Sequence, residues 1–297
     1  MALTFVYVCV ELAIDSQLKE AHDLAAFGEI AELIDAIGQT RFGTALDAVA
    51  AATVSFDISA VFVYPKSGNP ALLHDGLRGH GSQRAMANYL RGTYLLDAVY
   101  QACADQRPEG LHRLADLAPD DFFQSDYSNS ADVHPCISMA SGSLAEELVF
   151  LAVLANGATA AYSVMRKNGR PNFSDGEYAE LQALSGVVCK AMQRHWADLA
   201  FSRDATGETV WSRRGQLMEI GFESFAPDTL SPRERMIVRL MLKGHSTPSI
   251  GNVLEIAEGT VKNHKKNIYA KLAISSQNEL FAAFVRHVCG EAGQTKP

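Results

Sequence analysis

The sequence predicts two domains of different class: an N-terminal α+β domain with an antiparallel sheet flanked by helices, and an all-α C-terminal domain of four helices. Three observations indicate this division. Alternating apolar runs on both sides of Asn156-Gly157 are typical of a β-hairpin. Residues 229–290 contain a series of helix-start signals. They also carry nine Lys or Arg and four Glu, whereas residues 1–228 carry sixteen Lys or Arg and twenty-nine Asp or Glu, so a basic module follows an acidic one.

The first half of the N-terminal domain is expected to contain two helices followed by two strands. Residues 17–38 and 41–54 have apolar side chains at helical spacing. Residues 59–65 alternate as a strand does, and residues 70–76 follow a turn-forming stretch as the returning strand. The apolar side chains expected on one side of the first helix are Leu18, Ala25, Ile30, Leu33 and Ile34.

The second half is expected to be helical at 82–106, irregular at 107–140, and then to form the hairpin at 146–166. A long helix at 173–196 follows, with Ser174 and Glu177 as a capping box. This order of elements resembles the GAF- and PAS-type sensor domains, which implies a sensor domain over residues 1–200. We expect the less apolar residues 201–228 to form a linker to the C-terminal domain at 229–290.

Four helices are predicted between residues 229 and 290, and the second and third are joined by a tight turn. The helix-start signals are Ser231, Pro232 and Glu234 for the first helix, Thr247 and Pro248 for the second, and Ser276 and Glu279 for the fourth. Three short helices with this connection are the outline of a helix-turn-helix, whose third helix enters the major groove of DNA.

The third helix, which begins near residue 258, concentrates the basic charge of the chain. Val261, Ile268 and Leu272 give it a buried stripe, and polar and basic side chains fall mostly on the opposite side. Lysine can neutralise a phosphate, and asparagine can read adenine. A solvated charged face is the alternative interpretation. The residues that we expect to bind DNA are Thr260, Lys262, Asn263, Lys265, Lys266, Asn267 and Lys271.

Residues 230–280 resemble the LuxR/GerE-type DNA-binding domain. The matching motifs are Leu230-Ser231-Pro232-Arg233-Glu234-Arg235 at the start, Thr260-Val261-Lys262-Asn263-His264 in the third helix, and Lys271-Leu272 at its end. The resemblance implies that the third helix binds DNA and that the fourth often supports dimerisation. Phe281, Phe284 and Val288 could supply that dimer contact, and packing within the domain is the alternative for each.

The chain departs from the family pattern around the tight turn. Where the family has Gly-Ile-Ser, this chain has Glu255-Ile256-Ala257, so a glycine suited to positive φ and a capping serine are both missing. Gly251 also stands in the second helix, where glycine lowers helix stability. We expect a less stable domain, or weaker DNA binding by the isolated domain, without a change of function.

Tyr89, Tyr94 and Asp97 have nearly the spacing of the tyrosines and the following Asp-Pro in the acyl-homoserine-lactone receptors, so this stretch resembles their ligand-binding segment. In those receptors the Asp receives the ligand amide, which implies that role for Asp97 here. Ala98 replaces the proline, and the upstream tryptophan is missing, so we expect a related pocket with a different ligand. The expected ligand-binding residues are Tyr89, Tyr94, Asp97, Tyr100, Phe122 and Tyr127. Control by a partner protein, with these side chains serving as packing, is the alternative.

Catalytic and metal-binding motifs such as HExxH, CxxC and GxxxxGK[ST] do not occur in the sequence, so we expect no enzyme activity, no metal and no cofactor. The apolar N-terminal stretch is shorter than the about 20 residues that span a membrane. The sequence therefore predicts a cytoplasmic transcription regulator with no membrane partner. We expect a homodimer that binds a double-stranded DNA operator under the control of a small-molecule effector.

Overall fold

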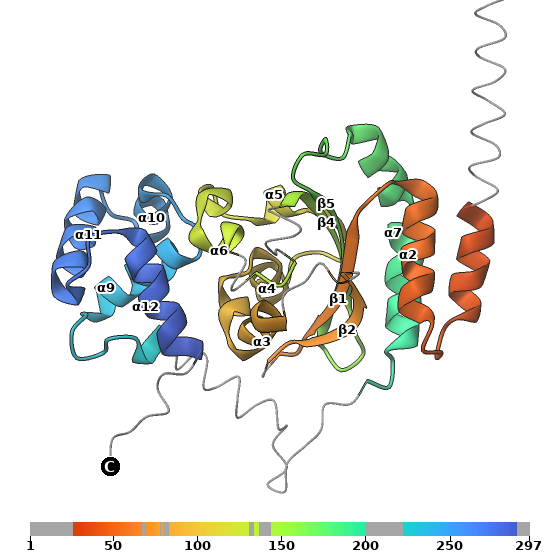
Figure 1. Cartoon of the computed structure of the whole chain (residues 1–297), viewed down its shortest axis with the longest axis horizontal. Coiled ribbons are helices and arrows are strands. Elements are labelled where there is room, and N and C mark those ends of the chain that lie inside the picture. Colours follow the sequence, from red (N-terminus) through yellow and green to blue (C-terminus); the bar gives the residue numbers. More distant parts are fainter. Residues whose placement is uncertain are drawn as a thin grey trace, which may run out of the picture.

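The computed structural model describes residues 26–66, 69–77, 79, 83–130, 134–136, 144–199 and 222–289. They form an α+β N-terminal domain and a helical C-terminal domain, as predicted (Figure 1). The start of the first predicted helix and residues 201–221 of the predicted linker lie outside the described residues.

A five-stranded antiparallel sheet forms the centre of the described N-terminal domain, with strand order β2-β1-β5-β4-β3. The strands are β1 (Ile58–Tyr64), β2 (Ala71–Gly76), β3 (Gly110–Arg113), β4 (Leu144–Val153) and β5 (Thr159–Lys167). The hairpin between β4 and β5 is confirmed: Asn156 and Gly157 lie in its turn, and Gly157 has a φ of 79°. The two strands of the first predicted hairpin, β1 and β2, also pair as expected.

The two faces of the sheet carry two separate cores, because successive side chains of a strand point to opposite faces. On β4, Leu148 and Phe150 belong to one core, and Val149 and Leu151 belong to the other. The first core is covered by α2 (Phe42–Thr53) and α7 (Asp175–His195). The second lies under α3 (Gln83–Arg91), η1 (Thr93–Leu96) and α4 (Ala98–Ala104), on the side that faces the C-terminal domain (Figure 1).

Helix α7 begins at the predicted capping box, in which Ser174 accepts from the Glu177 amide and Glu177 accepts from the Ser174 amide. One prediction for the first helix is wrong. Residues 26–35 are helical and Leu33 is fully buried, but the Ile34 side chain is 56% exposed. Adjacent residues on a helix point about 100° apart, so both could not face the same core.

The predicted helical segment 82–106 is divided into α3, η1 and α4. The division at Asp97 has a local cause, because its carboxylate accepts a hydrogen bond from the Val99 amide and caps α4. The prediction that residues 107–140 are irregular is wrong for β3, which pairs with β4. Short helical turns follow β3: α5 (Leu114–Leu117), η2 (Phe122–Gln124) and α6 (Asp126–Asn129).

The C-terminal domain consists of the four expected helices, α9 (Pro232–Leu242), α10 (Thr247–Leu254), α11 (Glu258–Leu272) and α12 (Gln277–Cys289). Their core also includes Phe222 and Phe225, which pack on the fully buried Phe284 ring at centroid distances of 4.6 and 5.5 Å. Among Phe281, Phe284 and Val288, Phe284 is therefore a core residue of the domain, and it offers no surface for dimerisation.

The helix starts follow the sequence signals with two corrections. At α12 the Ser276 hydroxyl accepts from the Glu279 amide as predicted, but the Glu279 carboxylate accepts from Ser275 and not from Ser276. Ser231 and Glu234 form the predicted capping box of α9. The cap of α10 is Ser246 and not Thr247, because the Ser246 hydroxyl accepts from the Ser249 amide. In the tight turn Glu255 has a φ of 53°, and Ala257 makes no side-chain cap for α11, so both departures from the family pattern fall at positions where they cost stability.

Candidate DNA-binding face and ligand site

Helix α11 has the two-sided character that the sequence predicts. Val261 and Ile268 are fully buried against the rest of the domain. The side chains at the other predicted positions, apart from Lys265, are exposed: Thr260, Lys262, Asn263, Lys266, Asn267 and Lys271. The open face of α11 therefore presents amide and ammonium groups, which suit base edges and phosphates.

A shallow cavity of about 500 Å³ runs along this face and joins α11 to the start of α10. Lys262, Lys265 and Lys266 line it together with Thr247, which is the first residue of α10. The N-terminus of a helix carries a partial positive charge that favours an anion; at α10 this charge is the main attraction, because Pro248 has no N–H and the Ser249 amide is bonded to Ser246. Both walls of the cavity thus favour a phosphate group.

Two of the predicted DNA-binding lysines have contacts inside the chain. The Lys271 ammonium donates to Glu234 at 2.7 Å and ties the end of α11 to the capping box of α9. Burial tends to raise the pKa of Glu234, but the hydrogen bonds from Lys271 and Ser231 outweigh it and hold the pKa at about 2. Lys265 is half-buried, which lowers its pKa, and the Asp121 carboxylate of the N-terminal domain opposes that shift.

The N-terminal domain contacts the C-terminal domain at residues 120–122, which we call the docking turn. The Asp120 carboxylate accepts from the Ser246 amide at 3.0 Å and from the Ser246 hydroxyl. The Asp121 amide donates to the Gly244 carbonyl at 2.9 Å. A Cβ atom at Gly244 would lie 2.5 Å from the Cα of Phe122, so the two backbones meet too closely for another side chain.

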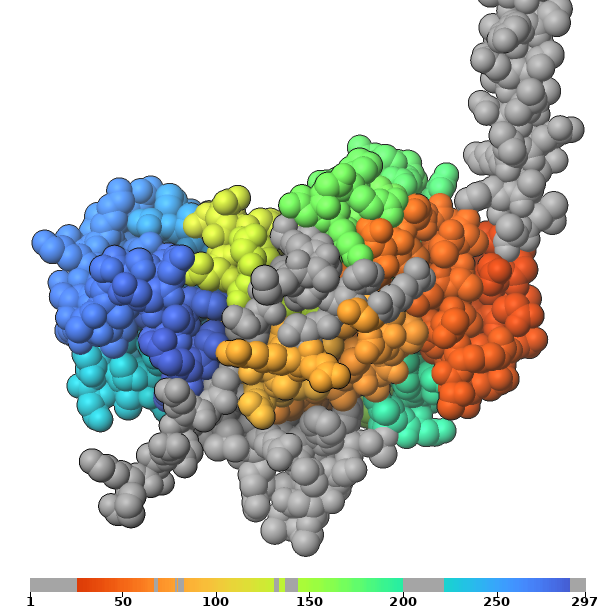
Figure 2. Space-filling view, in the orientation of Figure 1, coloured from red at the N-terminus to blue at the C-terminus, as the bar shows by residue number. Residues whose placement is uncertain are grey.

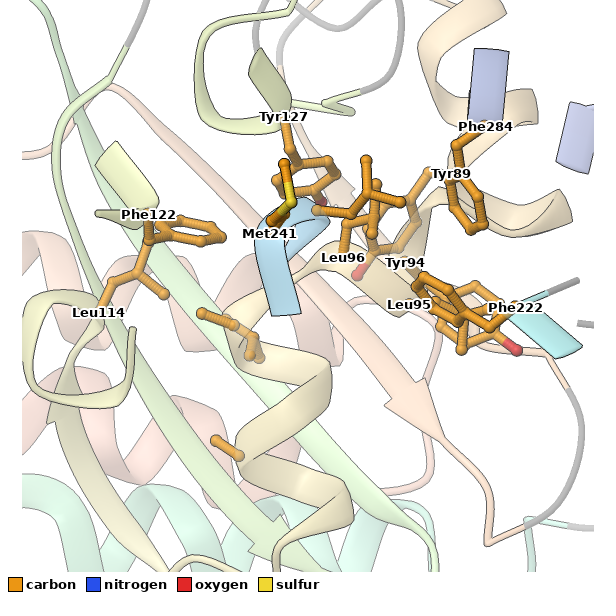
Figure 3. Close-up of a cluster of buried hydrophobic side chains, with 14 of the residues drawn as sticks. Tyr89, Tyr94, Leu95, Leu96, Leu114, Phe122, Tyr127, Phe222, Met241 and Phe284 are labelled. Atoms are coloured by element: carbon orange, nitrogen blue, oxygen red, sulfur yellow. The ribbon is translucent and has the colours of Figure 1, made fainter. Parts of the chain in front are cut away.

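A continuous apolar cluster accompanies these polar contacts. Met241 and Phe284 of the C-terminal domain share one buried cluster with Leu96 and Tyr127 of the N-terminal domain (Figure 3). Helix α12 also contacts α3, η1 and α6. In the space-filling view the C-terminal domain lies directly against the segments that precede residue 130 (Figure 2). The described domains therefore pack together as a unit.

The tyrosines and the aspartate of the predicted ligand site form a buried hydrogen-bonded chain. Tyr89 donates to Asp97 at 2.6 Å, and the Tyr64 and Tyr89 hydroxyls lie 2.5 Å apart. Burial raises the pKa of Asp97, although the hydrogen bonds from Tyr89 and the Val99 amide oppose the shift. The Tyr127 hydroxyl also lies close enough to Asp97 to lower its pKa, but it makes no geometrically sound hydrogen bond to a described residue.

The structure brings most of the predicted ligand-site residues together. Tyr89, Tyr94 and Tyr127 are at most 2% exposed and belong to one buried cluster, in which Tyr89 donates to Asp97. Tyr100 is half-buried and lines a cavity of about 480 Å³ with Tyr64. Phe122 differs from the others because it also takes part in the contact between the domains. Its ring packs against Tyr127, and its backbone lies against Gly244.

Two features of the candidate sites were not anticipated from the sequence. Glu147 on β4 is buried beside this network. Burial, together with the nearby Asp97 carboxylate, raises the pKa of Glu147 to about 8. An acid within the apolar run of β4 was a signal that could have identified it. Asp120 and Ser246 are 126 residues apart, and no local sequence pattern connects them.

Comparisons with known proteins agree with the helix-turn-helix assignment of the C-terminal domain. Residues 228–284 match the family model of the bacterial regulatory proteins of the luxR family, GerE. A putative HTH-type transcriptional regulator in the exeN 3′ region of Aeromonas salmonicida is 30% identical over 144 residues, which cover 48% of this chain and 74% of that protein. The probable HTH-type transcriptional regulator GfsR of Streptomyces halstedii is 36% identical over 62 residues, 21% of this chain and 26% of that protein.

Solved structures with some similarity include the VqsR LBD domain from Pseudomonas aeruginosa, with a TM-score of 0.48 and 21% identity over 57% of this chain and 94% of that one. Escherichia coli SdiA has a TM-score of 0.38 and 16% identity over 84% of this chain and 91% of that one. In the described part of the chain, none of the helices has the length and apolar character needed to cross a bilayer.

Proposed function

This chain belongs to the LuxR family of bacterial regulatory proteins, and we propose that its N-terminal domain controls when the C-terminal domain binds the operator, in response to a small molecule. The chain is a DNA-binding transcriptional regulator, and its family is not a class of enzymes. The proposal concerns the N-terminal domain: what it senses and how it acts on the DNA-binding face.

The observation that carries the proposal is the position of Asp120 at the first turn of α10. Its carboxylate accepts hydrogen bonds from the amide and the hydroxyl of Ser246, the residue before Thr247 of the cation-lined cavity. A DNA phosphate approaching the same helix end would meet a negative charge already in place. The neighbouring Asp121 carboxylate adds a second negative charge beside Lys265.

We infer that the docked arrangement and the DNA-bound arrangement compete. Helix-turn-helix proteins commonly place helix N-termini and basic side chains on the phosphate backbone. The hydrogen bonds between Asp120 and Ser246 would have to break, or lengthen, before a phosphate could use the same donors. Weakening the docking turn would then increase the fraction of protein that is free to bind the operator.

The route from a small molecule to the docking turn runs through the shared apolar cluster. Tyr89, which donates to Asp97, lies in that cluster together with Met241 and Phe284 of the C-terminal domain (Figure 3). A ligand that displaces the tyrosines would repack the surface on which the DNA-binding domain rests. A difference in ligand affinity between the docked and undocked states would supply the coupling free energy.

A second candidate function is control by a partner protein. One observation favours it: Tyr89, Tyr94 and Tyr127 are at most 2% exposed, and Tyr89 is already hydrogen-bonded within the network. A network that is filled by its own side chains does not need a ligand to complete it. A partner that binds the N-terminal domain could then release the docking turn from outside.

For the DNA complex we propose contacts from Thr260, Lys262, Asn263, Lys265, Lys266 and Asn267 of α11. Lys271 has a contact inside the domain, through Glu234, and we propose a mainly structural role for it. A homodimer would place two such helices on adjacent half-sites. We propose that it acts in the cytoplasm, where a bacterial operator is accessible.

The control of DNA binding can be tested with the full chain and an operator duplex selected by the protein from a random-sequence pool. The affinity for that duplex is measured by fluorescence anisotropy in the presence of a panel of small molecules. The proposal predicts that at least one of them changes the affinity. An affinity that responds to a partner protein, but to no small molecule, would favour the second candidate.

A further inference from the structure

A second cavity lies at one end of the sheet, on the far side of Tyr64 from the Tyr89–Asp97 hydrogen bond. It is formed where the end of β1, helix α4 and the turn between β4 and β5 come together, and its volume is about 480 Å³. Tyr64, Tyr100, Cys103 and Val153 provide aromatic and apolar wall surface. Cavities of about 300–1,000 Å³ with such walls are typical of small-molecule sites.

The charged side chains that line this cavity are all of one sign. Lys66 and Arg107 both border it and are exposed, and no carboxylate is among its lining residues. Neither cation forms an ion pair within the described part of the chain. The cavity therefore combines an apolar wall with two cations that are available to an anionic group.

Contact with the β4–β5 turn fixes the course of the Lys66 side chain. A Cβ atom added at Gly157 would lie 2.7 Å from Lys66 Cε, so the lysine stem crosses the turn directly over the glycine. Gly157 also has a φ of 79°, which disfavours a side chain there. The absence of a side chain at position 157 thus allows the ammonium to reach the cavity.

Among the residues that the structure describes, none on the inner wall of the cavity has a charged side chain that could pair with a second charged group of a ligand. The Tyr64 hydroxyl is hydrogen-bonded to Tyr89. Burial and the nearby Asp97 carboxylate raise the pKa of the Cys103 thiol, which keeps it neutral. A ligand with charge at one end only would fit, with its apolar part inside and its charged group at the cations.

We propose that this cavity binds an amphipathic monocarboxylate, with the carboxylate on Lys66 and Arg107 and the apolar body against Tyr64 and Tyr100. The proposal rests on the proposed small-molecule control and names the chemical class of the effector. A cationic ligand would be repelled by the same two side chains, and a neutral one would forgo the charge-assisted contacts.

Helix α4 connects this cavity to the DNA-binding domain. Tyr100 and Cys103 of α4 line the cavity, while Gln101 of the same helix accepts a hydrogen bond from Lys243 at 2.6 Å. Lys243 is the C-cap of α9 and immediately precedes Gly244, which contacts the docking turn. A ligand that shifts α4 would therefore change the contact at the docking turn.

The test uses the full chain and isothermal titration calorimetry with three probes of equal chain length: decanoate, decanol and decylamine. We expect decanoate to bind about tenfold more tightly than the other two, because it alone gains the charge-assisted contacts. Lys66→Met and Arg107→Met should each reduce decanoate affinity by about tenfold. Lys190→Met, at an exposed lysine on α7, is the matched control and should bind decanoate as the wild type does.

Equal affinity for the three probes, or decanoate affinity unchanged in both cavity variants, would overturn the cavity proposal. Thermal unfolding of each variant, with a melting temperature equal to that of the wild type, shows that a loss of binding is local. Operator affinity is measured in parallel. If another small molecule changes the operator affinity while decanoate does not bind, the cavity proposal fails and small-molecule control stands. Specific binding of decanoate supports the cavity proposal even where the operator affinity stays constant.

Discussion

Asp120 of the N-terminal domain accepts hydrogen bonds from both the amide and the hydroxyl of Ser246, the residue that caps helix α10 of the DNA-binding domain. The Ser246 hydroxyl oxygen thus caps α10, while the amide and hydroxyl hydrogens of Ser246 bind Asp120 of the N-terminal domain. Burial tends to raise the pKa of Asp120, but the hydrogen bonds from Ser246 outweigh it, and the pKa lies below its ordinary value. The contact is therefore made by the charged carboxylate.

Replacing this carboxylate by an amide should release the DNA-binding domain. We expect Asp120→Asn to raise the operator affinity of the full chain by about fivefold, a typical size for coupling between two sites. Fluorescence anisotropy with a labelled operator duplex measures it. Asp35→Asn makes the same change of charge at an exposed position in the helix 26–35 and serves as the control. Equal gains in the two variants would show a general charge effect and no specific docking.

The lysines of α11 should differ in how they affect the salt dependence of DNA binding. Lys262→Ala and Lys266→Ala each remove an exposed ammonium from the cation-lined cavity, so each should flatten the slope by about one unit. Lys271→Ala should leave the slope nearly unchanged and lower thermal stability, because its ammonium is bound to Glu234. Slopes are measured from operator affinity over a series of salt concentrations, and a full unit lost in Lys271→Ala would place that residue on DNA.

Asn263 is exposed on the open face of α11, and its amide can pair with an adenine edge. We expect Asn263→Ala to reduce the preference for the operator over unrelated duplexes, with a smaller effect on binding to unrelated DNA. A loss of about 1–3 kcal/mol in discrimination is typical for one lost base contact. Competition with single-base operator variants measures it. Equal weakening for all duplexes would indicate a phosphate contact instead.

The capping box of α9 should make stability depend on acid pH. The pKa of Glu234 is about 2 in the folded protein, against an ordinary value of 4.5. Because the folded pKa is the lower one, the stabilisation is fully present above about pH 4.5 and is lost as the pH falls toward 2. Urea unfolding of Glu234→Gln should show a free energy about 1 kcal/mol lower at pH 7 and a weaker acid dependence than the wild type.

The turn before α11 offers two stabilising substitutions. Glu255 has a φ of 53°, so Glu255→Gly should relieve about 1 kcal/mol of backbone strain. Ala257→Ser should add about 1 kcal/mol by capping α11, which lacks a side-chain cap. Urea unfolding, followed by circular dichroism, measures both changes. Gly251→Ala is the contrasting case and should destabilise, since its Cβ would lie 2.9 Å from the Ile256 carbonyl oxygen.

Local chemistry explains why much of the fold could be predicted. The capping boxes of Ser174 and Ser231 and the turn at Asn156-Gly157 each lie within four residues, and their signals are visible in the sequence. Strand β3 was missed because its four residues are held in place by pairing with β4, about forty residues away in the chain. Local patterns do not contain that information.

The same limit applies to the candidate sites. The exposed face of α11 follows from helical periodicity, and the spacing of Tyr89 and Asp97 brought both into one predicted site. The docking turn joins residues 126 positions apart, through a carboxylate that looks like any surface acid in the sequence. The buried Glu147 beside Asp97 likewise depends on how the sheet and α4 pack.

The central claim is that the docking turn and the operator compete for the same face of the DNA-binding domain. The most direct test is the distance between spin labels on the exposed positions Asp35 and Asp228, measured by pulsed electron paramagnetic resonance in the full chain with its native cysteines replaced. Without DNA, we predict one narrow distribution for the docked arrangement, and with saturating operator duplex a shift to a different or broader distribution. An unchanged narrow distribution in the DNA complex would contradict the account.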